Sequence, residues 1–143
     1  MSLILIYLVV LPTPTEEFKD ERINEFNEKV IEFEENEYNG EFHSRFKIPH
    51  GKGEMVFPNG NKYKGSFKFG QPFGFGEMFL NNNEKFVGNF KNGKFSGFGK
   101  YSYSDGSYFE GLFENGLKHG EGKSVDRNGD QTNQKWQNGN LVP

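Results

Sequence analysis

The sequence contains no cysteine, which excludes disulfide bridges, thiolate metal sites and a cysteine nucleophile. It also lacks a long apolar run, since the first eleven residues, MSLILIYLVVL, fall well below the roughly 20 residues needed to cross a bilayer. That run has neither the basic start nor the small-residue cleavage site of a secretory signal. Only 33% of the residues are apolar, an unusual share for an enzyme with a large aliphatic core.

Glycine and phenylalanine are abundant instead, with 19 and 17 residues among 143. Aromatic rings must therefore supply most of the buried surface. The net charge of −3 combines two unlike regions: residues 1–37 carry 3 basic and 10 acidic side chains, and residues 38–143 carry 14 and 10. The basic excess of the second region is too small and dispersed to indicate nucleic-acid binding. A chain of this length forms one domain, here residues 38–143, with residues 1–37 as an appendage.

The N-terminal appendage has two parts. Its first eleven residues are interpreted as a buried strand or a segment that docks onto a partner, with membrane association, targeting and cleavage as alternatives. The capping-box sequence TPTE, with proline at the first helical position, predicts a helix over residues 14–33. Because an amphipathic face must be buried, the helix is expected to cover a sheet or to bind a partner. Its apolar residues at helical spacing are Ile23, Phe26, Val30 and Phe33.

The sequence HGEGKS at residues 119–124 has the letters of a phosphate-binding P-loop but not its spacing. A P-loop needs a glycine five residues before Gly122, because that spacing folds backbone N–H groups around the phosphates. Leu117 occupies this position, and no apolar strand precedes it. The glycines therefore need another explanation.

A period of 23 residues explains them. Complete units start at Tyr63, Phe86 and Phe109, and each has glycine two positions later, phenylalanine four positions later and a Gly-x-Gly pair further on. An earlier unit starts at Tyr38 with a two-residue insertion, and a half unit near residue 132 keeps Trp136. The repeat-defining glycines are Gly65, Gly74, Gly76, Gly88, Gly97, Gly99, Gly111, Gly120 and Gly122.

This unit resembles the MORN repeat (membrane occupation and recognition nexus), which has the form Tyr-x-Gly-x-Phe/Trp-x-x-Gly-x-x-x-Gly-x-Gly. The resemblance covers about residues 38–139. It implies an all-β repeat fold, an elongated single-layer antiparallel β-meander of hairpins, preceded by the N-terminal extended segment and the helix. The residues agree, since positions 1, 3 and 5 of a unit point to one face of a strand and Asn-Gly turns join the strands.

The aromatic face created by this alternation is the candidate site. A bare glycine between two rings leaves a slot that is expected to receive a neighbouring ring. A one-layer sheet is expected to bury such a face only against the helix or a partner, and exposed aromatic ridges are typical of interaction surfaces. The predicted partner-binding residues are Tyr38, Phe42, Tyr63, Phe67, Phe86, Phe90, Phe109, Phe113 and Trp136.

No set of residues converges on catalytic chemistry. His50 and His119 occupy the same repeat position and are expected to be turn residues. Glu54 and Glu77 recur once per unit, as solvent-facing residues do, and the segment Asp126–Asp130 lacks the spacing of a calcium loop. We therefore predict that the chain is not an enzyme and has no catalytic residue, cofactor or metal site.

The resemblance implies a structural role, because MORN repeats serve as scaffolds in ciliary and cytoskeletal assemblies, in membrane contacts and as appendages of catalytic domains. Residues 1–37 are too few to form a catalytic domain. We expect a scaffold subunit that binds proteins of a larger assembly. The bias toward Phe, Asn and Lys, typical of the AT-rich genomes of ciliated and parasitic protists, favours an axonemal or other cytoskeletal assembly.

The alternative is an adaptor for a membrane surface or an acidic phospholipid. The expected location is cytoplasmic, cytoskeletal or ciliary, and association with an organelle or a membrane stays open. No nucleic-acid partner is expected. The lysines that support the lipid alternative are Lys62, Lys64, Lys68, Lys85, Lys91 and Lys94.

Overall fold

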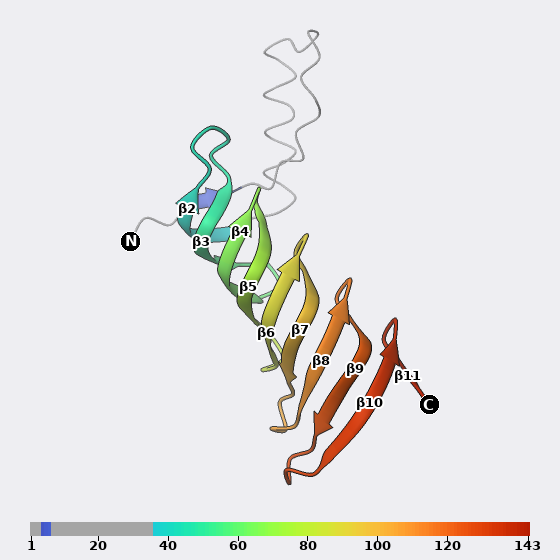
Figure 1. Cartoon of the computed structure of the whole chain (residues 1–143). Coiled ribbons are helices and arrows are strands. Elements are labelled where there is room, and N and C mark those ends of the chain that lie inside the picture. The colour runs from blue at the N-terminus through green and yellow to red at the C-terminus, as the bar shows by residue number, and fades with distance from the viewer. Residues whose placement is uncertain (1–3, 7–35) are drawn as a thin grey trace.

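The computed structural model describes residues 4–6 and 36–143, which form eleven β-strands in a single antiparallel sheet (Figure 1). The strands lie in the sheet in the order in which they occur in the chain, so the predicted all-β meander is confirmed. The strands are β1 (Ile4–Ile6), β2 (Asn36–Phe42), β3 (Pro49–Val56), β4 (Lys62–Lys68), β5 (Gln71–Phe79), β6 (Lys85–Lys91), β7 (Lys94–Ser102), β8 (Tyr108–Glu114), β9 (Leu117–Val125), β10 (Gln131–Gln137) and β11 (Asn140–Val142).

Part of the N-terminal appendage belongs to the sheet. β1 pairs antiparallel with β2, and Ile4 lies opposite Tyr38. The helix expected over residues 14–33 lies outside the described residues, as does most of the first eleven. The predictions that this segment docks onto a partner or covers the sheet therefore stay predictions.

Two kinds of turn join the strands from β3 to β11, and a six-residue loop joins β2 to β3. At one end, two-residue turns place both residues at positive φ, as in Asn92 (51°) and Gly93 (76°), and the predicted Asn-Gly turns are therefore confirmed. At the other end, five residues connect the strands, and the fourth of them adopts a left-handed conformation. The glycine N–H of each two-residue turn donates to a carbonyl of the preceding hairpin, for example from Gly93 to Pro72 at 3.1 Å. These bonds tie successive hairpins together beyond the sheet ladder.

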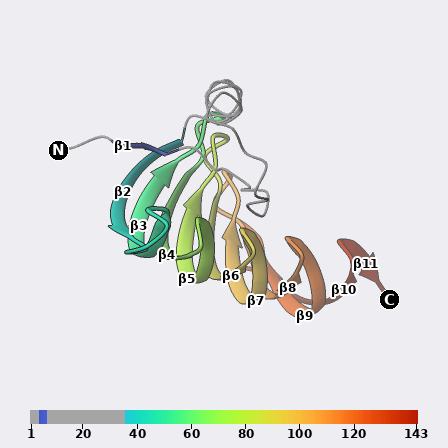
Figure 2. The ribbon, with the colours of Figure 1, turned by 90° about the horizontal axis from the view of Figure 1, so that it is seen from above.

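Every complete hairpin also carries a β-bulge. The pairing register shifts between Gly65 and Phe67, and again between Gly88 and Phe90. On the bulged strands Gly74 and Gly97 adopt positive φ values of 75° and 69°, which few side chains tolerate. A bulge bends its strand and increases the local twist. Because the bend recurs in each unit, the strands form arcs and the sheet curls toward one face (Figure 2).

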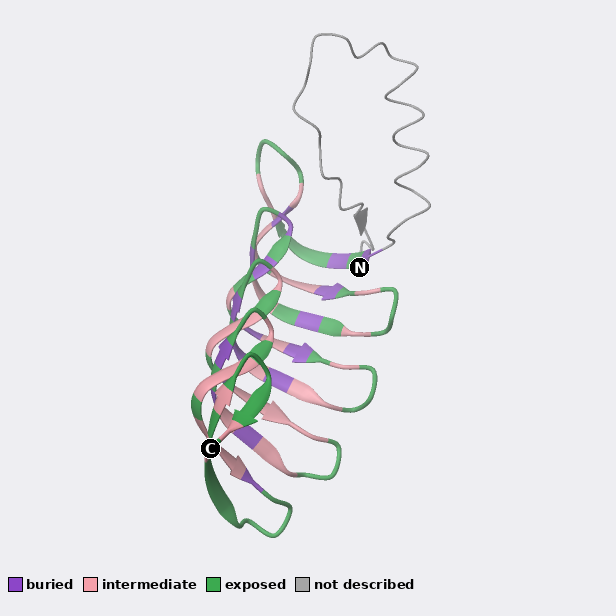
Figure 3. Ribbon diagram, turned by 90° about the vertical axis from the view of Figure 1, so that its right-hand side faces the viewer, coloured by how far each residue is buried: buried purple, intermediate pink, exposed green. Residues whose placement is uncertain are grey.

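The core lies on the inner, concave side of this curl, and the buried residues recur on successive strands (Figure 3). The six rings expected on a common face are all there, with exposures from 0 to 5%. They are Tyr63, Phe67, Phe86, Phe90, Phe109 and Phe113.

Each unit places its first ring on a pair of glycines that face each other across two strands. Gly88 pairs with Gly99 beneath Phe86, and Gly65 pairs with Gly76 beneath Tyr63. A Cβ on Gly88 would lie 2.7 Å from the Gly99 Cα and 2.9 Å from the Phe86 Cζ, which is closer than real Cβ contacts. The expectation that a neighbouring ring fills this slot is therefore wrong. The ring of the same unit fills it, because the bent strand folds that ring over its own glycine.

Candidate functional site

The nine rings predicted to bind a partner form one continuous ladder. The first ring of each unit makes an edge-on contact with the second ring of its own unit and with that of the next unit. Tyr63, for example, lies 5.0 Å from Phe67 and 4.8 Å from Phe90, measured between ring centroids. Such pairs contribute about 0.5–1.5 kcal/mol each beyond their buried area. Across all nine rings the spacing ranges from 4.8 to 6.1 Å.

This ladder is mostly the core of the sheet rather than an open surface. Seven of its rings are at most 5% exposed, and Phe42 and Trp136 at the two ends are partly buried. The rings of the ladder therefore cover one another, and the expectation that the helix or a partner also covers this face stays a prediction. Partner binding by these nine residues stays a prediction, but the ring surface left for a partner is small.

The C-terminal end of the ladder is closed by a lysine. Lys118 occupies the repeat position held by Pro49, Pro72 and Phe95 in the earlier units. Its Nζ lies 4.5 Å from the Phe109 ring centroid and 4.4 Å from that of Trp136, and it donates to the Tyr103 hydroxyl at 2.6 Å. A cation held over two rings replaces the apolar contact of the other units.

The two most exposed rings lie on the outer, convex face. Phe98 is 62% exposed and Phe75 is 59% exposed, the two highest values among the large apolar residues that the structure describes. Both are the middle residue of a Gly-x-Gly sequence, 23 positions apart. Sequence reasoning missed them, although strand alternation gives a usable signal, because a residue next to an inward-facing glycine, Gly76 or Gly99, must point outward.

The register places these two rings in one line across the sheet, which we call the outer row. Phe75 lies opposite Asn89, and Phe98 lies opposite Leu112, which is 44% exposed. The full row, from β3 to β10, is Lys52, Ser66, Phe75, Asn89, Phe98, Leu112, Glu121 and Lys135.

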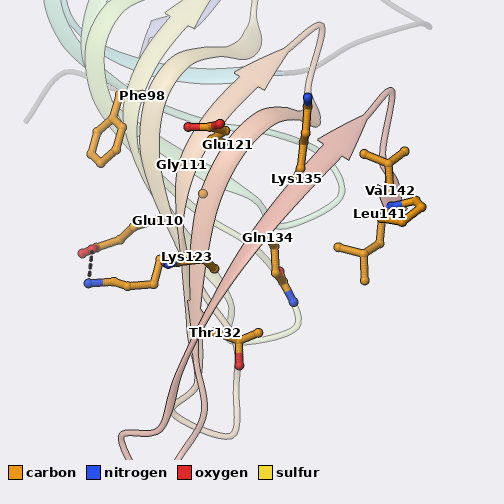
Figure 4. Close-up of a pocket in the computed structure, with 13 residues that line it drawn as sticks. Phe98, Glu110, Gly111, Glu121, Lys123, Thr132, Gln134, Lys135, Leu141 and Val142 are labelled. Atoms are coloured by element: carbon orange, nitrogen blue, oxygen red, sulfur yellow. Dashed lines mark ion pairs between the residues drawn. The ribbon is translucent and has the colours of Figure 1, made fainter.

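Shallow grooves accompany the outer row. A groove of about 960 Å³ runs beside Phe98, with Leu141 and Val142 on its far side (Figure 4). Gly111 and Gly122 form part of its floor, and Glu121 lines it. A second groove, of about 540 Å³, runs beside Phe75 over the glycines of the first two units. The missing glycine side chains thus leave room for the inner rings, and the backbone of the same glycines lines the grooves of the outer face.

A charged band runs alongside the outer row. The Glu54 carboxylate lies 3.2 Å from the Lys64 Nζ and 3.5 Å from that of Lys62, and Glu77 lies 3.4 Å from Lys85. The hydrogen bond from Lys64 lowers the pKa of Glu54 below its ordinary value, helped by the nearby Lys62 charge. Three of the six lysines that supported lipid binding are therefore engaged with carboxylates.

The histidines lie against turns. His50 Nδ1 accepts the Phe69 N–H at 3.3 Å, and His119 Nδ1 accepts the Asn138 N–H at 3.2 Å, which is the equivalent bond three units later. The expectation that these two histidines are turn residues is wrong: they lie in β3 and β9, and each accepts a hydrogen bond from a residue of a neighbouring turn. Sequence reasoning missed that Phe69, His50 and His43 form an aromatic cluster, with ring centroids 5.1 to 5.4 Å apart.

Residues 4–6 and 36–143 contain no group of three or more His, Cys, Asp or Glu side chains placed to hold a metal ion. In the same part of the chain, no helix has the length and apolar character needed to cross a membrane. These described residues form a surface with the two most exposed rings, grooves lined by glycine backbone and a band of paired charges.

The comparison with protein families agrees with the repeat register. The MORN repeat model matches residues 38–62, 63–84, 86–108 and 109–131. The first of these segments contains the two-residue insertion, and the half unit near residue 132 lies beyond the last one. No curated protein matches the chain.

Proposed function

The chain belongs to the MORN repeat family, and from this premise we propose that it is a non-catalytic scaffold that binds another protein through the outer face of its sheet. The observation that carries the proposal is the exposure of Phe75 and Phe98 on that face. Burying one such side chain contributes about 1.5–3 kcal/mol, and aromatic residues are enriched where proteins bind one another.

The charges on this face favour a protein over an anionic membrane. Lipid binding through lysines needs free positive charge, worth about 1 kcal/mol per residue near an anionic surface. Lys62, Lys64 and Lys85 lie instead within 3.5 Å of carboxylates, and Lys68 lies over the ring of Phe73 at 4.8 Å. The band is thus almost neutral, which supports contact through the rings.

We further assign the scaffold to a ciliary or other cytoskeletal assembly. The support for this is the composition of the chain and the roles of MORN repeats in such assemblies. A tagged chain in the native cells is expected to stay with the cytoskeletal fraction after detergent extraction. Complete release into the soluble fraction would contradict this assignment.

The binding face is tested by co-purification from the same cells. We expect the double variant Phe75→Ser with Phe98→Ser to lose at least four-fifths of any partner retained in stoichiometric amounts by the native chain. Phe46→Ser is the matched control, because Phe46 is also exposed, at 49%, but belongs to the loop between β2 and β3. Retention of the partner by the double variant would show that the outer face is not the binding surface.

A second arm tests the lipid alternative directly. The purified chain is sedimented with vesicles of phosphatidylcholine alone or with phosphatidylserine. We expect no salt-sensitive binding to the anionic vesicles. Binding that weakens steeply with ionic strength, and that survives loss of the two rings, would establish the membrane adaptor instead.

A further inference from the structure

One position of the repeat forms a line of four residues with three different chemistries on the outer face. Lys52, Phe75, Phe98 and Glu121 are 23 residues apart in sequence. They lie on β3, β5, β7 and β9, so that one strand separates each from the next. All four are exposed. The line therefore reads basic, aromatic, aromatic, acidic across the sheet.

The spacing of this line suits a polyproline II helix. Neighbouring strands lie about 4.7–4.9 Å apart, so two strands give about 9.4–9.8 Å and the whole line spans about 28–29 Å. A polyproline II helix rises about 3.1 Å per residue, so three residues advance about 9.3 Å and nine advance about 28 Å. An α-helix with one contact per heptad advances about 10.5 Å per contact. Its three intervals would take about 31.5 Å, which is longer than the line.

The surface chemistry suits the same ligand. Proline-rich segments dock on exposed aromatic rings, and they bring little ordering cost because polyproline II is already extended. Their backbone carbonyls have no internal partner. Asn89 is exposed on β6, between the strands that carry Phe75 and Phe98, where its side-chain amide can donate to such a carbonyl.

The two ends of the line define the charges of the ligand. Lys52 favours an acidic residue at one end, and Glu121 favours a basic residue at the other, which gives opposite charges three residues outside the two ring contacts. Lys135 faces Glu121 from β10 and weakens the acidic end, so the rings carry more of the affinity than the charges. Charge complementarity thus selects a ligand with unlike ends.

We propose that the outer row binds a proline-rich segment of a partner protein in the polyproline II conformation. Prolines three residues apart lie on Phe75 and Phe98, an acidic residue lies at Lys52 and a basic residue at Glu121. This inference rests on the proposed scaffold function and names the class of segment that the outer face takes. It predicts the pattern [DE]-x-x-P-x-x-P-x-x-[KR], or the same pattern read in reverse, because a polyproline II helix can lie in either direction.

The probe is the labelled peptide Asp-Ala-Pro-Pro-Ala-Pro-Pro-Ala-Pro-Arg, measured by fluorescence anisotropy against the full chain. We expect saturable binding that Phe75→Ser and Phe98→Ser each weaken at least tenfold, while Phe46→Ser leaves it within about twofold. A peptide with alanine at every proline is expected to bind at least tenfold more weakly. Both ring variants should keep the native thermal midpoint, because these side chains are exposed.

The charges are tested by a matched exchange. A peptide with aspartate at both ends should bind the native chain more weakly than the unlike-ended peptide, and Glu121→Lys should restore its affinity. An equal affinity for both peptides in low salt would overturn the assignment of the two ends.

Three results would overturn the proposal as a whole: no binding at millimolar peptide, binding that the ring variants leave unchanged, or tighter Phe98-dependent binding of a heptad-patterned helical peptide. These results are distinguishable from failure of the scaffold function. If the native partner still co-purifies through Phe75 and Phe98 while the proline peptide does not bind, the scaffold stands and the polyproline assignment falls. If neither the native partner nor the proline peptide binds through Phe75 and Phe98, the scaffold proposal and the polyproline assignment are both wrong.

Discussion

The inner and outer faces of the sheet use the same repeat in different ways. On the inner face, every unit places an aromatic ring on a pair of facing glycines, from Tyr38 to Phe109. On the outer face, the middle position of the Gly-x-Gly sequence varies along the array, and only two of its four occupants are aromatic. The inner position is fixed because its neighbours lie within van der Waals contact, whereas the outer position faces solvent. The variable face is therefore where a specific ligand can be selected.

The largest expected difference between the faces is in the response to loss of a ring. Phe86→Ala removes a side chain that is 0% exposed and contacts Phe90, Phe95 and Phe113, so it should cost about 3–5 kcal/mol of unfolding free energy. Phe98→Ala, on the outer row, should change stability by less than about 0.5 kcal/mol. Urea denaturation of the two variants checks the pair.

Equal losses in the two variants would contradict the assignment of the faces. A smaller loss at Phe86 would indicate that the neighbouring units move to fill the space. Comparing the dependence on urea concentration separates these cases, because a change in its slope indicates a change in the surface exposed on unfolding.

A smaller effect is expected from adding a side chain where the repeat has none. Gly88→Val places a branched side chain against Gly99 and Phe86, and overpacking of this kind costs about 1–3 kcal/mol. The neighbouring substitution Asn89→Val points outward and should be close to neutral, because valine favours strands. Differential scanning calorimetry should therefore show a lower thermal midpoint for the first variant alone. Identical midpoints would show that the inner slot can open.

The repeat could be predicted from the sequence because the packing of the inner face requires the same residue types in each unit. The 23-residue register placed Tyr63 and Phe67 on one face, and Asn-Gly predicted the turn at Asn92. The curl of the sheet could not be predicted from the sequence. It depends on β-bulges, and the bends that they cause add up only when the hairpins pair with one another. Phe75 and Phe98 were missed for a related reason. They occupy a position whose residue varies along the array, and a repeat pattern defined by identical residues does not include such a position.

The two-residue turns differ between units in the residue that adopts the left-handed conformation. Phe69 adopts φ 47° at the position that later units give to Asn92, Asn115 and Asn138. A left-handed conformation costs most side chains about 1–2 kcal/mol, and asparagine less. Asn92→Phe is therefore expected to destabilise the sheet by about 1 kcal/mol, and thermal unfolding measures it.

The reverse substitution sharpens this comparison. Phe69→Asn should raise the unfolding free energy by less than Asn92→Phe lowers it. The Phe69 ring also contacts His43 and His50, and those contacts disappear in the variant. If Phe69→Asn lowered the midpoint instead, the aromatic cluster would outweigh the backbone strain in the first turn.

The smallest expected effect belongs to the charged band of the outer face. The Lys64 hydrogen bond lowers the pKa of Glu54 in the folded chain, so the pair stabilises the fold above the ordinary glutamate pKa and loses this contribution as the pH falls through the lowered value. Because the Glu54 side chain is 37% exposed, the contribution should be about 0.2–1 kcal/mol at most. Glu54→Gln should therefore reduce stability slightly at pH 7, and its stability should converge with that of the native chain only as the pH falls through the lowered pKa of Glu54. In 1 M salt, where the screening length is about 3 Å, the two chains should differ less at every pH. A difference that persists unchanged in salt would mean that Glu54 acts through packing, as the inner residues do, rather than through charge.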